Sequence, residues 1–267
     1  MTTINKICID SRFRVSGTNT DFRVELPESV LLPERSACMI TDISIPHSWY
    51  SIDNNNCRLY LRLDRGGTLT DTWVSLSSKN YDIDSLAQEI QTTLTVISAS
   101  FTATAQAQLG VIFITHNASV STFRLLTDAE LLTSLAGGWT GAPYDTRNPF
   151  SCNNVLGNVE PQINTPLSLF RSGFVDTLSH HNIYITSPNL GSFQNYGPRG
   201  ERNILKKVVV DVPFGSVVVD TLLNTDDYTE CSKQLLKTLD FKVCDVYGTA
   251  MELHGATVSF SIVFKSI

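Results

Sequence analysis

The sequence predicts an all-β protein: a single jelly roll, that is, an eight-stranded antiparallel β-sandwich, with a small α+β subdomain inserted into it. Three observations support this fold class. Short segments in which apolar and polar residues alternate recur along most of the chain, as expected of strands with one face in a core. Residues typical of turns, such as Pro, Gly and Asn, separate these segments. One stretch, residues 79–140, instead contains apolar residues at helical spacing.

The strongest strand pattern lies at the C-terminal end, in residues 236–243 and 257–265. Each run alternates between apolar and mostly polar positions, so each is predicted to bury one face. We expect two adjacent strands, joined by a loop through Asp245 to Gly248, whose buried faces share one core. The inward-facing residues would be Leu239, Phe241, Val243, Val258, Phe260, Ile262 and Phe264. The sheet would then close only when the last residues of the chain arrive.

Six further segments carry strand patterns, which brings the total to eight, the number of strands in a jelly roll. They are residues 21–26, 37–45, 57–63, 71–77, 182–187 and 204–212. The total omits the weak run Val217 to Leu222 and the segment Ile4 to Ile9, which is interpreted as a short strand or an ordered arm. The predicted domains are therefore an N-terminal arm (1–20), a jelly roll (21–78 and 141–267) and the inserted subdomain (79–140).

The inserted subdomain is predicted to have a small core of its own. Its first helix should begin after Asp82 as N-cap and bury Ile83, Leu86, Ile90 and Leu94. Strands are expected at 101–106, 111–115 and 122–126. Thr127 and Glu130 have the spacing of a capping box. They predict a short second helix with Leu131, Leu132 and Leu135 on its apolar side, ended by Gly137-Gly138. The following segment, Thr140 to Ser179, has no sustained period and several prolines, and is predicted to be a long ordered loop.

Composition excludes several classes of protein. The hydrophobic fraction of 42% in 267 residues is enough for a real core. A formal net charge of -6 argues against strong nucleic-acid binding, which needs an excess of Lys and Arg. The sequence shows neither a secretory signal nor a run of 18 apolar residues, so we expect synthesis in the cytosol, no secretion and no membrane span. The six cysteines have no CxxC spacing and are expected to be reduced, structural thiols.

The sequence contains no motif that carries catalysis. The patterns GxGxxG, GxxxxGK[ST], HExxH and GxSxG are all missing, which argues against an enzyme. No catalytic, cofactor-binding or metal-ligating residue is therefore predicted, and no cofactor. His180-His181 could bind a metal, but neighbouring strand residues point to opposite faces and no carboxylate or Cys cluster accompanies them. We expect a junction between loop and strand there, with one His packed and one solvated.

Two other features allow a functional and a structural interpretation. His254, which precedes Gly255, is expected to be a hydrogen-bonding turn residue. The basic run from Arg199 through Arg202 to Lys206-Lys207 could meet a phosphate or an acidic neighbour, or could simply be the solvated entry to a strand.

Several blocks of the sequence resemble penton-type minor capsid proteins of polintons, virophages and adintovirus-like DNA viruses. The N-terminal blocks are Ile9-Asp10-Ser11-Arg12-Phe13-Arg14, Asp21-Phe22 to Leu26-Pro27, and Ile43-Ser44-Ile45-Pro46-His47-Ser48-Trp49-Tyr50-Ser51-Ile52-Asp53-Asn54-Asn55-Asn56. Tyr81 to Leu94, Leu131 to Trp139, Ser187-Pro188-Asn189-Leu190 and Asp240 to Phe264 are similar to later blocks.

The resemblance implies a virion protein with a single jelly roll. Five copies would surround each icosahedral vertex, as a homopentamer beside trimers of a double jelly-roll major capsid protein. It also implies an insertion that forms an outer domain, and such a domain could meet a host receptor.

Two alternatives remain open. A trimeric viral receptor-binding or carbohydrate-binding head would use aromatic residues such as Trp49, Trp73 or Trp139 at a sugar site, although each is expected to lie in a core or an interface. A cupin-like metalloenzyme would need His and carboxylate ligands on neighbouring strands, a pattern not found in the sequence.

Overall fold

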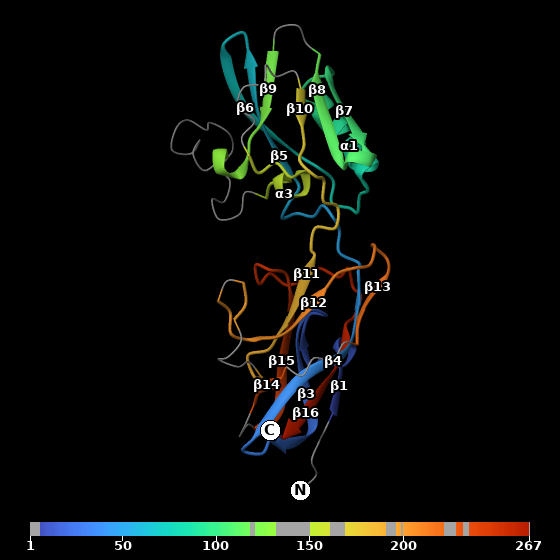
Figure 1. Ribbon diagram of the computed structural model, residues 1–267, viewed down its shortest axis with the longest axis vertical. Helices are drawn as coiled ribbons and strands as arrows, with labels where there is room; N and C mark the ends of the chain where they lie inside the picture. Colours follow the sequence, from blue (N-terminus) through green and yellow to red (C-terminus); the bar gives the residue numbers. More distant parts are fainter. Residues whose placement is uncertain are drawn as a thin grey trace. The chain divides into compact units, whose positions relative to one another are not determined.

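The computed structural model describes residues 6–117, 121–131, 150–160, 169–190, 196–198, 200–221, 228–231 and 235–266. The chain divides into two compact units (Figure 1). The jelly-roll unit consists of Met1–Trp49 and His180–Ile267, and the inserted unit is Tyr50–Ser179. The jelly-roll unit therefore contains both ends of the chain.

Two antiparallel sheets form the jelly-roll unit. The first, here the β16 sheet, has the order β1 (Lys6–Asp10), β16 (Ser259–Ser266), β4 (Ser36–Pro46) and β13 (Val217–Asp220), with the short β14 (Thr229–Glu230) also paired to β4. The second, here the β15 sheet, has the order β12 (Ile204–Val209), β11 (Asn182–Thr186), β15 (Leu235–Cys244), β3 (Asp21–Leu31) and β2 (Ser16–Gly17). In Figure 1 the blue N-terminal and red C-terminal strands lie side by side.

The pairing of these strands is that of a jelly roll. Apart from the short β2 and β14, the described residues of the unit form eight strands, which pair first with last and so on inward: β1 with β16, β3 with β15, β4 with β13, and β11 with β12. This nested order of pairs is that of one long hairpin whose bend lies between β11 and β12. Rolling the hairpin up adds the pairs β16–β4 and β11–β15, which complete the two sheets. The predicted all-β jelly-roll fold is confirmed.

Two of the eight expected strands belong elsewhere. Residues 57–63 and 71–77 form β5 and β6 of the inserted unit. Their places in the jelly roll are taken by β1 and β13, the two segments omitted from the predicted total. Alternation shows that a segment has one buried face, but it does not show which core that face enters.

The two C-terminal strands lie in opposite sheets, so the expected adjacent pair is wrong. They face each other across the core, where the rings of Phe241 and Phe260 lie 5.1 Å apart at 81°. The predicted shared core is correct, because all seven residues expected to point inward are buried. Two strands that each present an apolar face can meet either edge to edge or face to face, and the pattern is the same in both cases.

The described residues of the inserted unit form two three-stranded sheets. One has the order β6 (Thr68–Ser75), β5 (Arg58–Arg65) and β9 (Ser121–Leu125), and the other β10 (Leu169–Arg171), β8 (Val111–His116) and β7 (Phe101–Gln106). The helix α1 (Ile83–Thr95) packs on β7 and β8, and the short elements η2 (Ala107–Leu109) and α3 (Asn153–Leu156) complete the described part.

One core holds the inserted unit together, and it extends beyond the predicted boundaries. It joins Leu61 of β5, Ile90 of α1, Ile114 of β8 and Phe170 of β10. Residues 79–140 therefore share their core with residues 52–76 and 152–175, in contrast to the expected independent core. The short α3 and β10 also lie in the segment that was expected to be loop.

The first helix, the three strands and the capping box predicted within the inserted unit are confirmed. Helix α1 begins after Asp82, whose carboxylate accepts a hydrogen bond from the Ser85 amide at 2.8 Å. The capping box forms as expected: the Thr127 amide donates to the Glu130 carboxylate at 3.0 Å, and the Glu130 amide donates to the Thr127 hydroxyl at 3.2 Å. Leu132, Leu135 and Gly137-Gly138 lie outside the described residues.

Candidate functional site

The jelly-roll unit has two open sides, where the edges of its two sheets approach each other. On the first, here the β1–β3 side, the edge strand β1 lies next to β3 of the other sheet. On the second, here the β12–β13 side, the edge strands are β12 and β13. Exposed strand edges and the apolar side chains near them are the usual places where such a protein meets partners.

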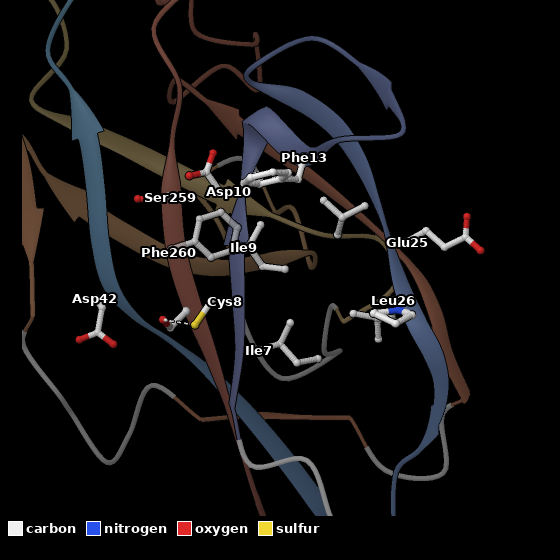
Figure 2. A pocket seen from close by; sticks show the side chains of 13 residues that line it. Ile7, Cys8, Ile9, Asp10, Phe13, Glu25, Leu26, Asp42, Ser259 and Phe260 are labelled. Atoms are coloured by element: carbon white, nitrogen blue, oxygen red, sulfur yellow. Dashed lines mark hydrogen bonds between the residues drawn. The ribbon is translucent and has the colours of Figure 1, made fainter.

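A cavity of about 510 Å³ lies on the β1–β3 side (Figure 2). Its lining is Ile7, Cys8, Ile9, Asp10, Phe13, Val24, Glu25, Leu26, Pro27, Asp42, Ser259, Phe260 and Ser261. Figure 2 shows Ile7 and Ile9 directed toward Leu26 across the gap between the sheets, whereas Cys8 points the other way, toward Ser261. The hollow therefore borders both faces of the edge strand β1.

Local hydrogen bonds place Phe13 at the mouth of this cavity. The Asp10 carboxylate accepts from the Arg12 amide at 2.9 Å and caps the short helix η1 (Ser11–Phe13). Ser11 is fully buried: its amide donates to the Val258 carbonyl, and its hydroxyl accepts from the Val258 amide, each at 3.0 Å. This anchor turns the chain out of β1 and leaves Phe13 78% exposed.

The charged residues that line the cavity are all acidic: Asp10, Glu25 and Asp42. Each carboxylate has a cationic partner outside the lining, namely Arg12 at 2.5 Å, Lys237 at 3.2 Å and Lys6 at 2.5 Å, respectively. The hydrogen bond from Arg12 lowers the pKa of Asp10, and that from Lys6 lowers the pKa of Asp42. Both carboxylates are therefore anionic at neutral pH.

Apolar side chains are also exposed on the edge strands β12 and β13, where they point out of the outer faces of the two sheets. Val209 of β12 is 56% exposed, and Val217 and Val219 of β13 are 47% and 62% exposed. Phe214, in the connection between the two strands, is also exposed. Alternation along β13 places Val218 in the core, so its two neighbours must face solvent.

The basic run of the sequence divides on this side. Lys206 is buried and lies 3.8 Å from Asp220, so this ion pair joins the edge strands of the two sheets. Lys207, the next residue of β12, is exposed. Arg202 donates to the Tyr196 hydroxyl at 3.1 Å and covers that ring, while Arg199 lies outside the described residues. The interpretation of the run as a solvated strand entry is correct for Lys207 but wrong for Lys206.

The histidines occupy the positions expected of structural residues. His180 is half-buried and His181 exposed, immediately before β11 begins at Asn182. Among the described residues no group of three His, Cys, Asp or Glu side chains could hold a metal ion. His254 has a φ of 50°, and its Nδ1 lies 2.8 Å from the Ser48 carbonyl, which confirms the hydrogen-bonding turn residue.

Two of the three tryptophans can be placed. Trp49 is buried and stacks on His47 with ring centroids 4.2 Å apart, so it does not line an open sugar site. Trp73 of β6 packs against a small core formed by Tyr60, Leu126 and Leu131. The Arg58 guanidinium lies over its ring, 4.6 Å from the centroid. Trp139 lies outside the described residues.

All six cysteines are free thiols, and each of them except Cys8 is buried. Burial raises the pKa of Cys244 to about 11, so this group is a neutral thiol at physiological pH. Burial of five of the six thiols agrees with the structural role expected for them. Cys8, by contrast, is exposed on the β1–β3 side.

Sequence reasoning found neither open side. The exposed Phe13, Val217 and Val219 look like core residues in a strand pattern, and nothing in their order marks them as solvent-facing. A hint was available: an apolar residue at every position from Val217 to Val219 exceeds what a strand with one buried face requires.

Comparison with known proteins identifies the fold. No family model matches the chain, and no curated protein matches it in sequence. Among solved structures, the mavirus penton protein aligns with 98% of this chain and 99% of its own, at a TM-score of 0.54 and 9% sequence identity. The D2–D3 domains of the flagellar cap protein FliD from Escherichia coli align at a TM-score of 0.15 and 11% identity, with coverage of 98% and 99%, which is too low to indicate a shared fold. The chain has the fold of a virophage-type penton protein.

No described helix has the length and apolar character needed to span a membrane.

Proposed function

We propose that the chain is a structural virion protein, the penton subunit that forms homopentamers at the icosahedral vertices of a viral capsid. The observation that carries the proposal is the agreement with a penton protein along the whole chain, so that both the jelly roll and the inserted unit are matched. An insertion of this size between two jelly-roll strands is a more specific feature than the jelly roll itself, which serves many functions.

The properties of the described surface support a subunit that packs against copies of itself. The jelly-roll unit exposes apolar side chains at Phe13 and on its edge strands β12 and β13, which suits an assembly more than an isolated monomer.

The proposal includes partners and a location. The jelly-roll unit would lie within the capsid shell beside a double jelly-roll major capsid protein. The inserted unit would form an outer domain that could contact a host receptor. The protein would be synthesised in the host cytosol and would function in the virion, without a cofactor.

Native mass spectrometry and negative-stain imaging of the purified full chain test the proposal. The expected result is a species with five times the mass of one chain, seen as rings with five-fold symmetry. Trimers would favour the alternative of a receptor-binding or carbohydrate-binding head. A strict monomer across a wide range of salt and pH would contradict the penton assignment.

A second test addresses the partner. Co-expression with the major capsid protein of the same virus should yield particles in which the chain is present. Particles that assemble with the chain left in solution would argue against a place in the shell.

A further inference from the structure

We infer that Cys38 and Cys231 form a disulfide within one chain when the protein meets a small disulfide oxidant such as glutathione disulfide, and that this bond locks β14 onto β4. The inference goes beyond the proposed function. It assigns a redox modification site to the interior of the jelly-roll unit.

Strand pairing brings the two cysteines together. Thr229 of β14 lies opposite Cys38 of β4. The Cys231 amide donates to the Ser36 carbonyl at 2.9 Å, so the antiparallel order continues beyond β14. Thr229 and Cys231 are two positions apart and both are buried, which places them on one face of the sheet together with Cys38. Cys231 is therefore the diagonal neighbour of Cys38 across the strand pair.

The two side chains are in direct contact. Each residue is 1% exposed, and a hydrogen bond joins their thiol groups. The buried Cys244, in the same unit, has a different partner, because its thiol donates to the Tyr184 carbonyl at 3.7 Å. Two thiols in contact can be oxidised to a disulfide, whereas a thiol bonded to a carbonyl oxygen has no sulfur to join.

The shared hydrogen bond makes the two thiols chemically unequal. The bond from the Cys38 thiol lowers the pKa of Cys231, because it stabilises the thiolate of Cys231. The same bond and burial raise the pKa of Cys38. The thiolate is the nucleophile in thiol–disulfide exchange, so Cys231 is the residue expected to react first.

The exchange proceeds in two balanced steps. The Cys231 thiolate attacks one sulfur of glutathione disulfide, and the departing glutathione thiolate takes up the proton that Cys231 has lost. Cys38 then gives up its proton and attacks Sγ of Cys231, which releases the second glutathione as a thiol. Two protein thiols are oxidised, and one glutathione disulfide is reduced to two glutathione molecules.

Closure of the bond requires a small shift of β14. Diagonal neighbours across an antiparallel pair have Cα atoms about 7–8 Å apart, slightly more than the roughly 4.4–6.8 Å found in disulfides. The strand β14 pairs with β4 through Thr229 and Glu230, so few backbone hydrogen bonds oppose the shift or the brief opening that admits the oxidant. A bond formed in this way stays reducible by thiols.

The bond would fasten a weakly paired segment to the middle of a sheet. On its other edge, Cys38 pairs with Phe264 of β16, so the link would tie the chain ahead of β15 to the β16 sheet. The use of such a link rests on the proposed function. In a virion protein the pair would stay reduced in the host cytosol and become oxidised outside the cell.

Controlled oxidation of the full chain tests the inference. Cys8→Ser first removes the exposed thiol. The folded chain is incubated with glutathione disulfide, quenched with acid, unfolded and alkylated, and its peptides are mapped by mass spectrometry. The expected product is a peptide with Cys38 joined to a peptide with Cys231, while Cys244 remains a thiol that can be alkylated. Alkylation of every remaining thiol, or a covalent dimer in place of the internal link, would overturn the inference.

Two variants test the order of the steps. In Cys38→Ala, the reaction should stop at a mixed disulfide between Cys231 and glutathione. In Cys231→Ala, Cys38 should remain unmodified at the same time of incubation. Thermal melting of the reduced variants verifies folding. Glutathione on Cys38 in the second variant, without glutathione on Cys231 in the first, would overturn the assignment of Cys231 as the first nucleophile.

Hydrogen exchange tests the lock itself. In the oxidised chain, the peptide that contains β14 should exchange at least about tenfold more slowly than in the reduced chain, because the bond holds β14 against β4. Cys244→Ala is the matched control and should form the link and show the same slowing. Equal exchange in both redox states would overturn the lock. Native mass separates the two proposals: pentamers without the link refute this inference only, whereas a monomer that forms the link refutes the ring only.

Discussion

Removal of the chain from Thr257 onward should unfold the jelly-roll unit while the inserted unit stays folded. The truncation deletes β16, which lies between β1 and β4 and is the strand with which β1 pairs. It also removes four buried side chains, Val258, Phe260, Ile262 and Phe264. At about 1.5 to 3 kcal/mol each, their burial contributes roughly 6 to 12 kcal/mol. That loss is comparable with the whole stability of a domain, about 5 to 15 kcal/mol.

The inserted unit should survive because its core is built from residues within positions 52–175. Hydrogen exchange followed by mass spectrometry separates the two outcomes. Peptides from β4 and β15 should exchange at the rate of an unfolded chain, whereas peptides from β5 and β8 should keep their protection. A chain that ends at Lys265 serves as control and should keep both.

Two results would refute this reasoning. Retained protection of β4 in the truncated chain would mean that the β16 sheet does not depend on its central strand. Loss of protection in β5 and β8 would mean that the two units fold as one cooperative system rather than as separate cores.

Three further predictions follow from the same structure. Deletion of residues 79–140 should unfold the inserted unit but spare the jelly-roll unit, because α1 and β7 to β9 leave its core; exchange protection of β5 in that deletion would contradict the shared core. Asp82→Ala should cost about 1 kcal/mol at pH 7 through the loss of the helix cap. Because hydrogen bonds from Ser85 lower the pKa of Asp82, the charged cap stabilises fully above the ordinary pKa of 3.8, and this contribution is lost as the pH falls through the lower folded value. The difference in urea unfolding between wild type and Asp82→Ala should therefore shrink at pH 2, and an equal difference at both pH values would argue against it. Trp49→Phe should change the free energy of unfolding by less than about 1 kcal/mol, since the buried Trp49 Nε1 has no hydrogen-bond partner among the described residues and its removal offsets the lost ring area. Trp49→Ala should cost about 3 to 5 kcal/mol in the same urea titration, and a similar loss in Trp49→Phe would reveal an unrecognised partner.

The assignment of strands to cores illustrates the limit of a sequence pattern. The run 57–63 alternates as regularly as 236–243, yet β5 packs in the inserted unit and β15 in the jelly roll. Alternation is a property of one strand, whereas the identity of its neighbours depends on contacts between residues far apart in the chain. For that reason the sequence pattern did not place β1 in the jelly roll. This strand is only five residues long, and its partner β16 lies at the other end of the chain.

The candidate surfaces follow the same logic. The basic run allowed either a phosphate or acidic partner or a solvated strand entry, but Lys206 is buried beside Asp220, a residue that becomes its neighbour only when the β12 and β13 edges meet. Phe13 is a large apolar residue of the kind usually found in a core, yet it is exposed because Ser11 anchors the turn before it. Neither outcome can be obtained from local spacing, since both are set by tertiary contacts.

The sequence by itself determined the all-β class, the helix α1 with its cap, the capping box at Thr127 and which side chains of β15 and β16 are buried. These properties depend on the period of apolar residues and on hydrogen bonds within a few positions. The tertiary structure decided which eight strands form the jelly roll, that β15 and β16 face each other across the core, and that residues 50–179 form one inserted unit. Those properties depend on how the edges and faces of strands distant in sequence meet. Backbone hydrogen bonds join strand edges, and apolar packing joins sheet faces, whichever strands the complete chain brings together.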